Sequence, residues 1–102
     1  MIRVSVVSYL NSKPFVAGLT QNSIKTEIDL SLDIPSVCAE KLINGKVDIG
    51  LIPVAVLPLV KNAQIITPFC IASNGNVNSV LLLSQVALNE INQIWLDYHS
   101  RT

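Results

Sequence analysis

Charge is scarce in this chain and favours neither sign. Only 14% of its 102 residues are charged, and seven lysines and arginines balance seven aspartates and glutamates. A protein that binds nucleic acid or an anionic membrane surface usually carries a basic excess. We therefore expect neither nucleic acid nor a membrane as a partner.

Cysteine and histidine are also scarce. The chain has two cysteines, Cys38 and Cys70, and one histidine, His99. The cysteines form no CxxC motif and lie far apart, so the sequence holds no recognisable zinc pattern. We expect buried free thiols in a reducing compartment, and no bound metal.

Long apolar runs and targeting signals are missing as well. The longest apolar stretch, from Ile49 to Val60, is interrupted by Gly50, Pro53 and Pro58 and is too short to span a bilayer. The N-terminus alternates apolar and polar residues and has no signal-peptide cleavage pattern. These features predict a soluble, cytoplasmic protein.

Three common catalytic signatures are absent. The chain contains no GxSxG nucleophile elbow, no GxxxxGKS/T phosphate loop and no GxGxxG dinucleotide fingerprint. The spacing of its carboxylates does not define an acid–base pair either. Function has to be inferred from the polar segments that follow the predicted strands.

Apolar residues, in contrast, make up 50% of the chain. This is more than in an average soluble domain, and the length fits one small domain. The chain ends in 97–102, a polar turn of the kind that precedes a helix. We therefore expect residues 1–102 to be a single α/β lobe and an N-terminal fragment of a longer protein.

Hydrophobic periodicity predicts strands that alternate with helices in the first 60 residues. Asn11 and Ser12 are typical helix caps, and Pro35 opens a second helix that Gly45 ends. The order predicts an α/β fold with a mainly parallel open sheet, flanked by helices on right-handed crossovers. Strands are expected at Arg3–Val7, Thr26–Leu32 and Val47–Ile52. The second is expected to be half-buried, with Ile28, Leu30 and Leu32 on its apolar face and Glu27, Asp29 and Ser31 on its polar face.

The remaining residues carry shorter signals. Short helices are expected at Pro53–Val60 and Ala87–Asn92, and a turn is expected at Ser73–Asn76. Further short strands are expected at Ile65–Ile66, Phe69–Ala72, Ser79–Leu83 and Ile94–Leu96.

Polar segments follow several of these strands, at 8–13, 73–79 and 97–102. Ligands of open α/β sheets gather outside the carboxyl ends of the strands, so at least the first and last segments are expected to converge. The first segment also opens a helix, whose free N–H groups favour an anion. The residues alone therefore predict a site for a small anionic ligand.

Each polar feature also has a structural interpretation. Asn11 and Ser12 are explained by helix capping alone, and Asn74-Gly75 by a hairpin turn. His99 is typical of an exposed loop residue. Asp97 fits a cap at a strand end, and the Tyr9 ring fits packing at the sheet edge.

Four segments resemble motifs of one family. VSYLNSKPF is similar to the VSYLNTKP opening of the menaquinone biosynthesis dehydratases of the futalosine pathway, the MqnA family. IDLSLDIPSVCAEKLINGKVDIGLIPVAVL resembles that family's DLPS segment, CIASNGNVNSVLLLSQVALNEI its second loop, and LDYHSRT its SRT turn. The motifs occur in the family's order and cover nearly the whole chain.

The resemblance implies a fold and a reaction. The family's fold is a type II periplasmic-binding-protein-like fold with two α/β lobes, and this chain would be part of the first lobe. The implied activity is that of a lyase, chorismate dehydratase, which converts chorismate to 3-[(1-carboxyvinyl)oxy]benzoate in menaquinone biosynthesis. It needs neither a metal nor a redox cofactor.

The resemblance also implies site residues. Asn11 would hydrogen-bond the substrate's hydroxyl or carboxylate, while an amide is no useful base at neutral pH. His99 replaces a small residue of the family, and Gly75-Asn76-Val77 replaces its Gly-Pro-Val. Residues implied to bind the substrate are Ser8, Tyr9, Ser73, Ser79, Ser100, Arg101 and Thr102.

Two alternatives stay open. A non-catalytic protein that binds or senses a small anion is expected to use the same fold. An incomplete lobe is also expected to expose apolar surface, through which a homo-oligomer would form.

Overall fold

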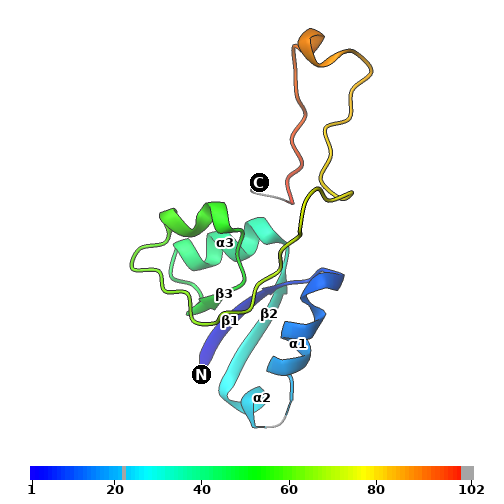
Figure 1. Cartoon of the computed structure of the whole chain (residues 1–102). Helices are drawn as coiled ribbons and strands as arrows, with labels where there is room; N and C mark the ends of the chain where they lie inside the picture. The colour runs from blue at the N-terminus through cyan, green and yellow to red at the C-terminus, as the bar shows by residue number, and fades with distance from the viewer. Residues whose placement is uncertain (22, 100–102) are drawn as a thin grey trace.

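The computed structural model describes residues 1–21 and 23–99, and its centre is a small parallel sheet. Strand β1 (Ile2–Val7) lies between β2 (Ile28–Asp33) and β3 (Ile49–Gly50), in the order β2-β1-β3. Val4 pairs with Leu30 on one side and with Ile49 on the other, and both pairings are parallel. The predicted α/β class and parallel open sheet are confirmed (Figure 1).

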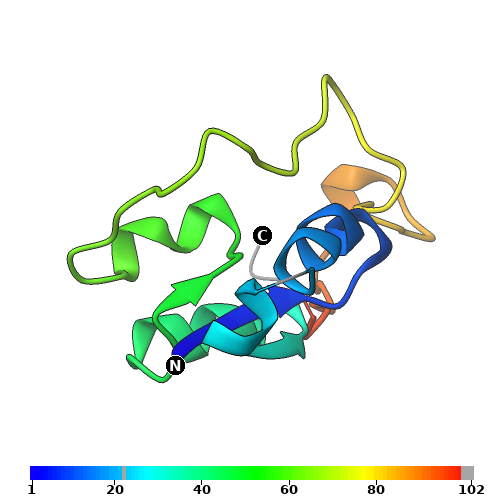
Figure 2. The same cartoon turned by 90° about the horizontal axis from the view of Figure 1, so that it is seen from below.

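Short helices connect the strands. The β1–β2 and β2–β3 crossovers run in opposite directions across the sheet, so right-handed connections put their helices on opposite faces, as Figure 2 shows. No helix within the described ranges is long and apolar enough to cross a membrane. The helical segments are α1 (Lys13–Leu19), α2 (Ile24–Glu27), α3 (Pro35–Ile43) and the 3₁₀ turns η1 (Leu10–Ser12), η2 (Val54–Leu59) and η3 (Leu88–Glu90).

The sheet buries side chains on both of its faces. Ser5 of β1 points toward α3, whose Cys38 and Ala39 are buried, and Val4 and Val6 are buried on the opposite face. Helix α3 ends as predicted, because Gly45 adopts φ 65° and its N–H donates to the carbonyl oxygen of Leu42 at 3.1 Å.

The second strand differs from its predicted pattern. Thr26 belongs to α2, and β2 begins two residues later at Ile28. Leu32 lies on the same face as its partner Val6, yet it is exposed because β2 is an edge strand. The polar residues Ser31 and Asp33 face α3 instead of solvent, since Asp33 accepts a hydrogen bond from Lys41.

The predicted strands after residue 60 are wrong. The described residues beyond Val60 contain no strand, and their helical structure is limited to η3, inside the predicted 87–92 helix. We call residues 77–96 the arm, which runs away from the sheet and returns (Figure 1). Val80 and Trp95 in its two apolar runs are exposed. Side chains of high β-propensity do not form a strand without a partner strand to pack against.

Candidate functional site

The loop after β1 lies at the sheet's topological switch point. The chain leaves β1 towards β2 and returns past it to β3, so the carboxyl ends of β1 and β3 border the position where open α/β sheets bind ligands. Ser8, Tyr9 and Asn11 occupy this loop, and all three are exposed. The Ser8 N–H donates to the carbonyl oxygen of Asp33 at 2.8 Å, which joins the loop to the end of β2.

Helix capping does not explain Asn11 and Ser12. Helix α1 has no side-chain cap, and Asn11 lies one turn earlier, in η1. Ser12 is fully buried, at 0% exposure, and its hydroxyl donates to Asn11 Oδ1 only over 3.5 Å. Because α1 has seven residues and Pro14 in its first turn lacks an N–H, the expected anion-binding helix end is weak. The Asn11 amide is left facing solvent.

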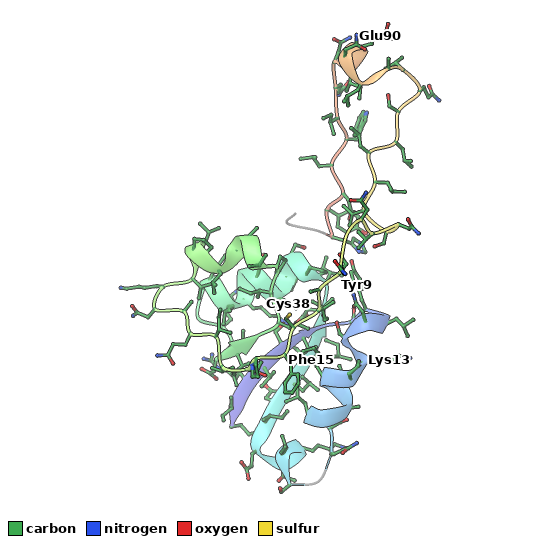
Figure 3. The ribbon with its side chains drawn as sticks, in the orientation of Figure 1. Tyr9, Lys13, Phe15, Cys38 and Glu90 are labelled. Carbon is green, nitrogen blue, oxygen red and sulfur yellow. The ribbon has the colours of Figure 1, made fainter. Side chains whose placement is uncertain are left out.

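Asn11 lines a cavity together with a distant segment. The cavity has a volume of ≈ 460 Å³ and is bounded by Asn11, Pro14 and Phe15 on one side and by 69–72 on the other. Figure 3 shows Phe15 between α1 and the extended segment that crosses the sheet. A flat ligand placed here would contact the Phe15 ring and have the Asn11 amide at its edge.

The first and last polar segments meet, as predicted. Tyr9 Oη and His99 Nδ1 share a hydrogen bond of 3.0 Å. At the start of α3, the Ser36 N–H donates to the His99 carbonyl at 3.1 Å, and the Ser36 hydroxyl donates to the Tyr98 carbonyl at 3.0 Å. His99 thus lies in a loop, as expected, but it is half-buried rather than exposed.

The other predicted site residues are not brought to Asn11. Ser73 follows the cavity segment directly, but its hydroxyl donates to the Gly75 carbonyl at 2.9 Å within its own turn. Ser79 is exposed in the arm, and none of the described contacts joins it to Tyr9 or Asn11. Asp97 accepts the His99 N–H at 3.3 Å, so it caps the final turn. Ser100, Arg101 and Thr102 lie outside the described residues.

Sequence reasoning missed a polar cluster beneath α3. Asp33 Oδ2 accepts hydrogen bonds from Ser5 Oγ at 2.7 Å, Ser31 Oγ at 2.8 Å and Lys41 Nζ at 2.6 Å. Ser5 Oγ also lies 3.1 Å from the buried Cys38 sulfur. The available signal was the register: Ser5 pairs with Ser31 and Asp33 follows on the same face, although alternation alone assigned that face to solvent.

Electrostatics make this cluster stable rather than reactive. Burial opposes ionisation of Asp33, but the hydrogen bonds from Lys41, Ser5 and Ser31 outweigh it and hold the pKa of Asp33 below its ordinary value. Burial raises the pKa of the Cys38 thiol, which keeps it protonated. The cluster holds α3 against β1 and β2. The carbonyl oxygen of Asp33 also accepts the Ser8 N–H, so the cluster is linked to the loop after β1.

A larger cavity lies apart from Asn11. It has a volume of ≈ 580 Å³ and is bounded mainly by β3, η2 and the 60–69 segment, with a largely apolar lining. Asp48 at its rim forms an ion pair of 2.8 Å with Arg3, whose hydrogen bonds lower the pKa of Asp48 to about 2. Because this pair joins the starts of β1 and β3, it lies at the end of the sheet opposite the switch point.

The predicted residues Ser8, Tyr9 and Asn11 thus share the exposed loop after β1, and Asn11 among them lines the described cavity. A scan against protein-family models matches residues 2–102 to a family described as menaquinone biosynthesis. The chain belongs to the menaquinone biosynthesis family. Searches of curated proteins and of solved structures each gave no match.

Membership in the menaquinone biosynthesis family confirms the family that the four sequence motifs indicated. It assigns the chain a role in menaquinone biosynthesis, within a family of enzymes that act on small molecules. The exposed polar loop at the carboxyl end of β1 lies at the position where open α/β sheets bind ligands.

Proposed function

We propose that the chain is the first part of a chorismate dehydratase, the lyase that forms 3-[(1-carboxyvinyl)oxy]benzoate in the futalosine pathway of menaquinone biosynthesis. Family membership and the four motifs support the pathway. The observation that carries the proposal is Asn11, exposed in the ≈ 460 Å³ cavity at the carboxyl end of β1 and free of a capping role.

The reaction removes one ring proton and the neighbouring hydroxyl as water, and the cyclohexadiene becomes an aromatic ring. The gain of aromaticity favours the product, so the protein has mainly to orient the substrate and assist the departing hydroxide. In the proposal, the Asn11 amide donates to that hydroxyl or to a substrate carboxylate. The Ser8 hydroxyl donates to the second carboxylate from the same loop, and Tyr9 shapes the wall beside it.

The proton acceptor lies elsewhere in the proposal. An amide does not accept a proton at neutral pH, and the lining of the Asn11 cavity is otherwise apolar except for the Cys70 thiol. A carboxylate of chorismate itself, or a residue of further protein, takes the proton. We further propose that residues 1–102 form part of the first lobe of a two-lobed, type II periplasmic-binding-protein-like fold in the cytoplasm, whose second lobe closes this crevice.

The test is substitution of Asn11 in the full-length protein. Asn11→Ala is expected to lower kcat/KM for chorismate by about 100-fold, the usual loss when a donor to a developing charge is removed. The melting temperature is expected to fall only slightly, because Asn11 caps no helix and the hydrogen bond it accepts from Ser12 is long, at 3.5 Å. Asn44→Ala, at the end of α3 on the surface, is the matched control and is expected to retain activity.

The outcomes separate the roles of Asn11. A folded full-length protein that leaves chorismate unchanged would rule out the dehydratase. A fall in stability without a fall in turnover would return Asn11 to a structural role. For residues 1–102 alone we expect little or no turnover, which single-turnover assays by absorbance would measure.

A binding function is the second candidate, because the cavity lining offers no carboxylate or imidazole as a base. In that case the protein would hold a small anion without changing it. Calorimetric titration of the full-length protein with chorismate and with common amino and carboxylic acids distinguishes the two functions. Tight binding of another solute, with chorismate left intact, would favour the sensor.

A further inference from the structure

We infer that Tyr9, Ser36 and His99 form a clasp that holds the turn at 97–99 against the loop presenting Asn11. The clasp makes His99 and Tyr9 positioning residues for the site. The effect of the clasp on turnover rests on the proposed function, whereas the contacts that form the clasp do not depend on it.

The clasp closes a contact between distant parts of the chain. Tyr9 and His99 are 90 positions apart, yet Tyr9 Oη and His99 Nδ1 lie 3.0 Å from each other. Their rings are nearly parallel, with centroids 6.4 Å apart and an interplanar angle of 20°. The turn is thus held by a side-chain hydrogen bond and an aromatic contact as well as by its backbone.

Ser36 provides the second half of the clasp. Its N–H belongs to the first turn of α3, where backbone donors have no partner inside the helix. The His99 carbonyl accepts this N–H at 3.1 Å, and the Ser36 hydroxyl donates to the neighbouring Tyr98 carbonyl at 3.0 Å. A backbone donor at the start of α3 is therefore paired with a backbone carbonyl of the 97–99 turn.

Tyr9 transmits the clasp to Asn11 through η1. The Tyr9 carbonyl accepts the Ser12 N–H at 3.1 Å, which closes the turn that contains Asn11. Ser12 is fully buried and fixes the other end of this turn. A shift of Tyr9 therefore rotates η1 about Ser12 and moves the Asn11 amide relative to the cavity.

The experiment follows hydrogen exchange at the Ser36 amide by NMR in the full-length protein. Tyr9→Phe removes the bond to His99 and is expected to speed this exchange about 5-fold, the value of one net hydrogen bond. His99→Ala is expected to do the same or more, and the double variant no more than His99→Ala. Tyr98→Phe, in the same turn with an exposed ring, is the matched control and is expected to change nothing.

Turnover gives the second measurement. Tyr9→Phe and His99→Ala are expected to lower kcat several-fold at unchanged global stability, and His99→Asn, whose amide oxygen can accept from Tyr9, to recover most of it. Unchanged Ser36 exchange in both single variants, or fully additive effects in the double variant, would overturn the clasp. Altered exchange in a protein without chorismate turnover would overturn the proposed reaction and leave the clasp standing.

Discussion

Two regions of this chain have similar apolar content, but the first forms a buried core and the second is exposed. In residues 1–60, Val4 of the central strand is only 2% exposed, whereas Trp95 in the arm is 88% exposed. The first region carries ten of the 14 charged residues, and from Asn62 to Leu96 the sole charged residue is Glu90. The region with fewer charges is thus the one without a core.

The difference shows that apolar content does not by itself make a core. In the first region, β1 has a strand on each side and helices lie over both faces of the sheet, so its side chains are covered. The arm has no such layer in the described structure. Extended exposed apolar surface of this kind is typical of surfaces that contact further protein.

The two cysteines give the largest expected contrast between the regions. Cys38 of α3 is buried as expected, whereas Cys70, in the segment before the arm, is exposed, contrary to the expectation that both thiols are buried. We expect a maleimide to modify Cys70 at least about 100-fold faster than Cys38, because Cys38 reacts only after local opening of the core and its raised pKa disfavours the thiolate. Mass spectrometry of timed, quenched samples measures both rates.

Two variants show which cysteine accounts for each modification rate. Cys70→Ser is expected to abolish the fast phase, and Cys38→Ala to leave it unchanged. Equal rates for the two thiols in the native protein would mean that α3 does not pack as described. Modification of both thiols in denaturant serves as the control for complete reactivity.

A matched pair of valines tests the same contrast by stability. Val4→Ala removes buried methyl groups and is expected to lower the free energy of unfolding by about 2 kcal/mol. Val80→Ala makes the same change in the arm, at a side chain that is 63% exposed, and is expected to cost less than about 0.5 kcal/mol. Urea titration followed by circular dichroism measures both, and equal losses would show that the arm packs against a core.

The sequence predicted the first region because local patterns and tertiary packing agree there. Alternation in β1, Pro35 at the start of α3 and Gly45 at its end each act within a few residues. The arm failed for the opposite reason, since β-propensity at Val80 or Trp95 describes a strand only where another strand lies beside it.

The residues of the candidate site also divide into those that local sequence patterns predict and those that depend on distant contacts. Asn11 was predicted because it follows a strand directly, and position after a strand is a local property. His99 was missed as a partner of Tyr9 because their contact spans 90 positions. Asp33 was missed because serine and aspartate alternating along a strand are typical of a solvent face, and only Lys41 and Cys38 on α3 cover that face.

The smallest expected effect compares two aspartates of β2. Asp33→Asn weakens three hydrogen bonds and the ion pair with Lys41, so we expect a loss of about 1–2 kcal/mol of unfolding free energy at pH 7. Asp29→Asn, in the same strand but exposed, is the matched control and is expected to change stability by less than about 0.5 kcal/mol. Chemical denaturation of the three proteins measures the difference.

The pH dependence of that difference identifies its electrostatic part. Because the folded-state pKa of Asp33 lies below its ordinary value of 3.8, the contribution is fully present above that value and is lost as the pH falls through the folded-state pKa. The gap between the wild-type protein and Asp33→Asn should therefore shrink in acid, while the gap to Asp29→Asn stays small throughout. A gap that stays constant down to the acid transition would show that Asp33 acts through shape and neutral hydrogen bonds, and that the charge of Lys41 contributes nothing to holding α3 on the sheet.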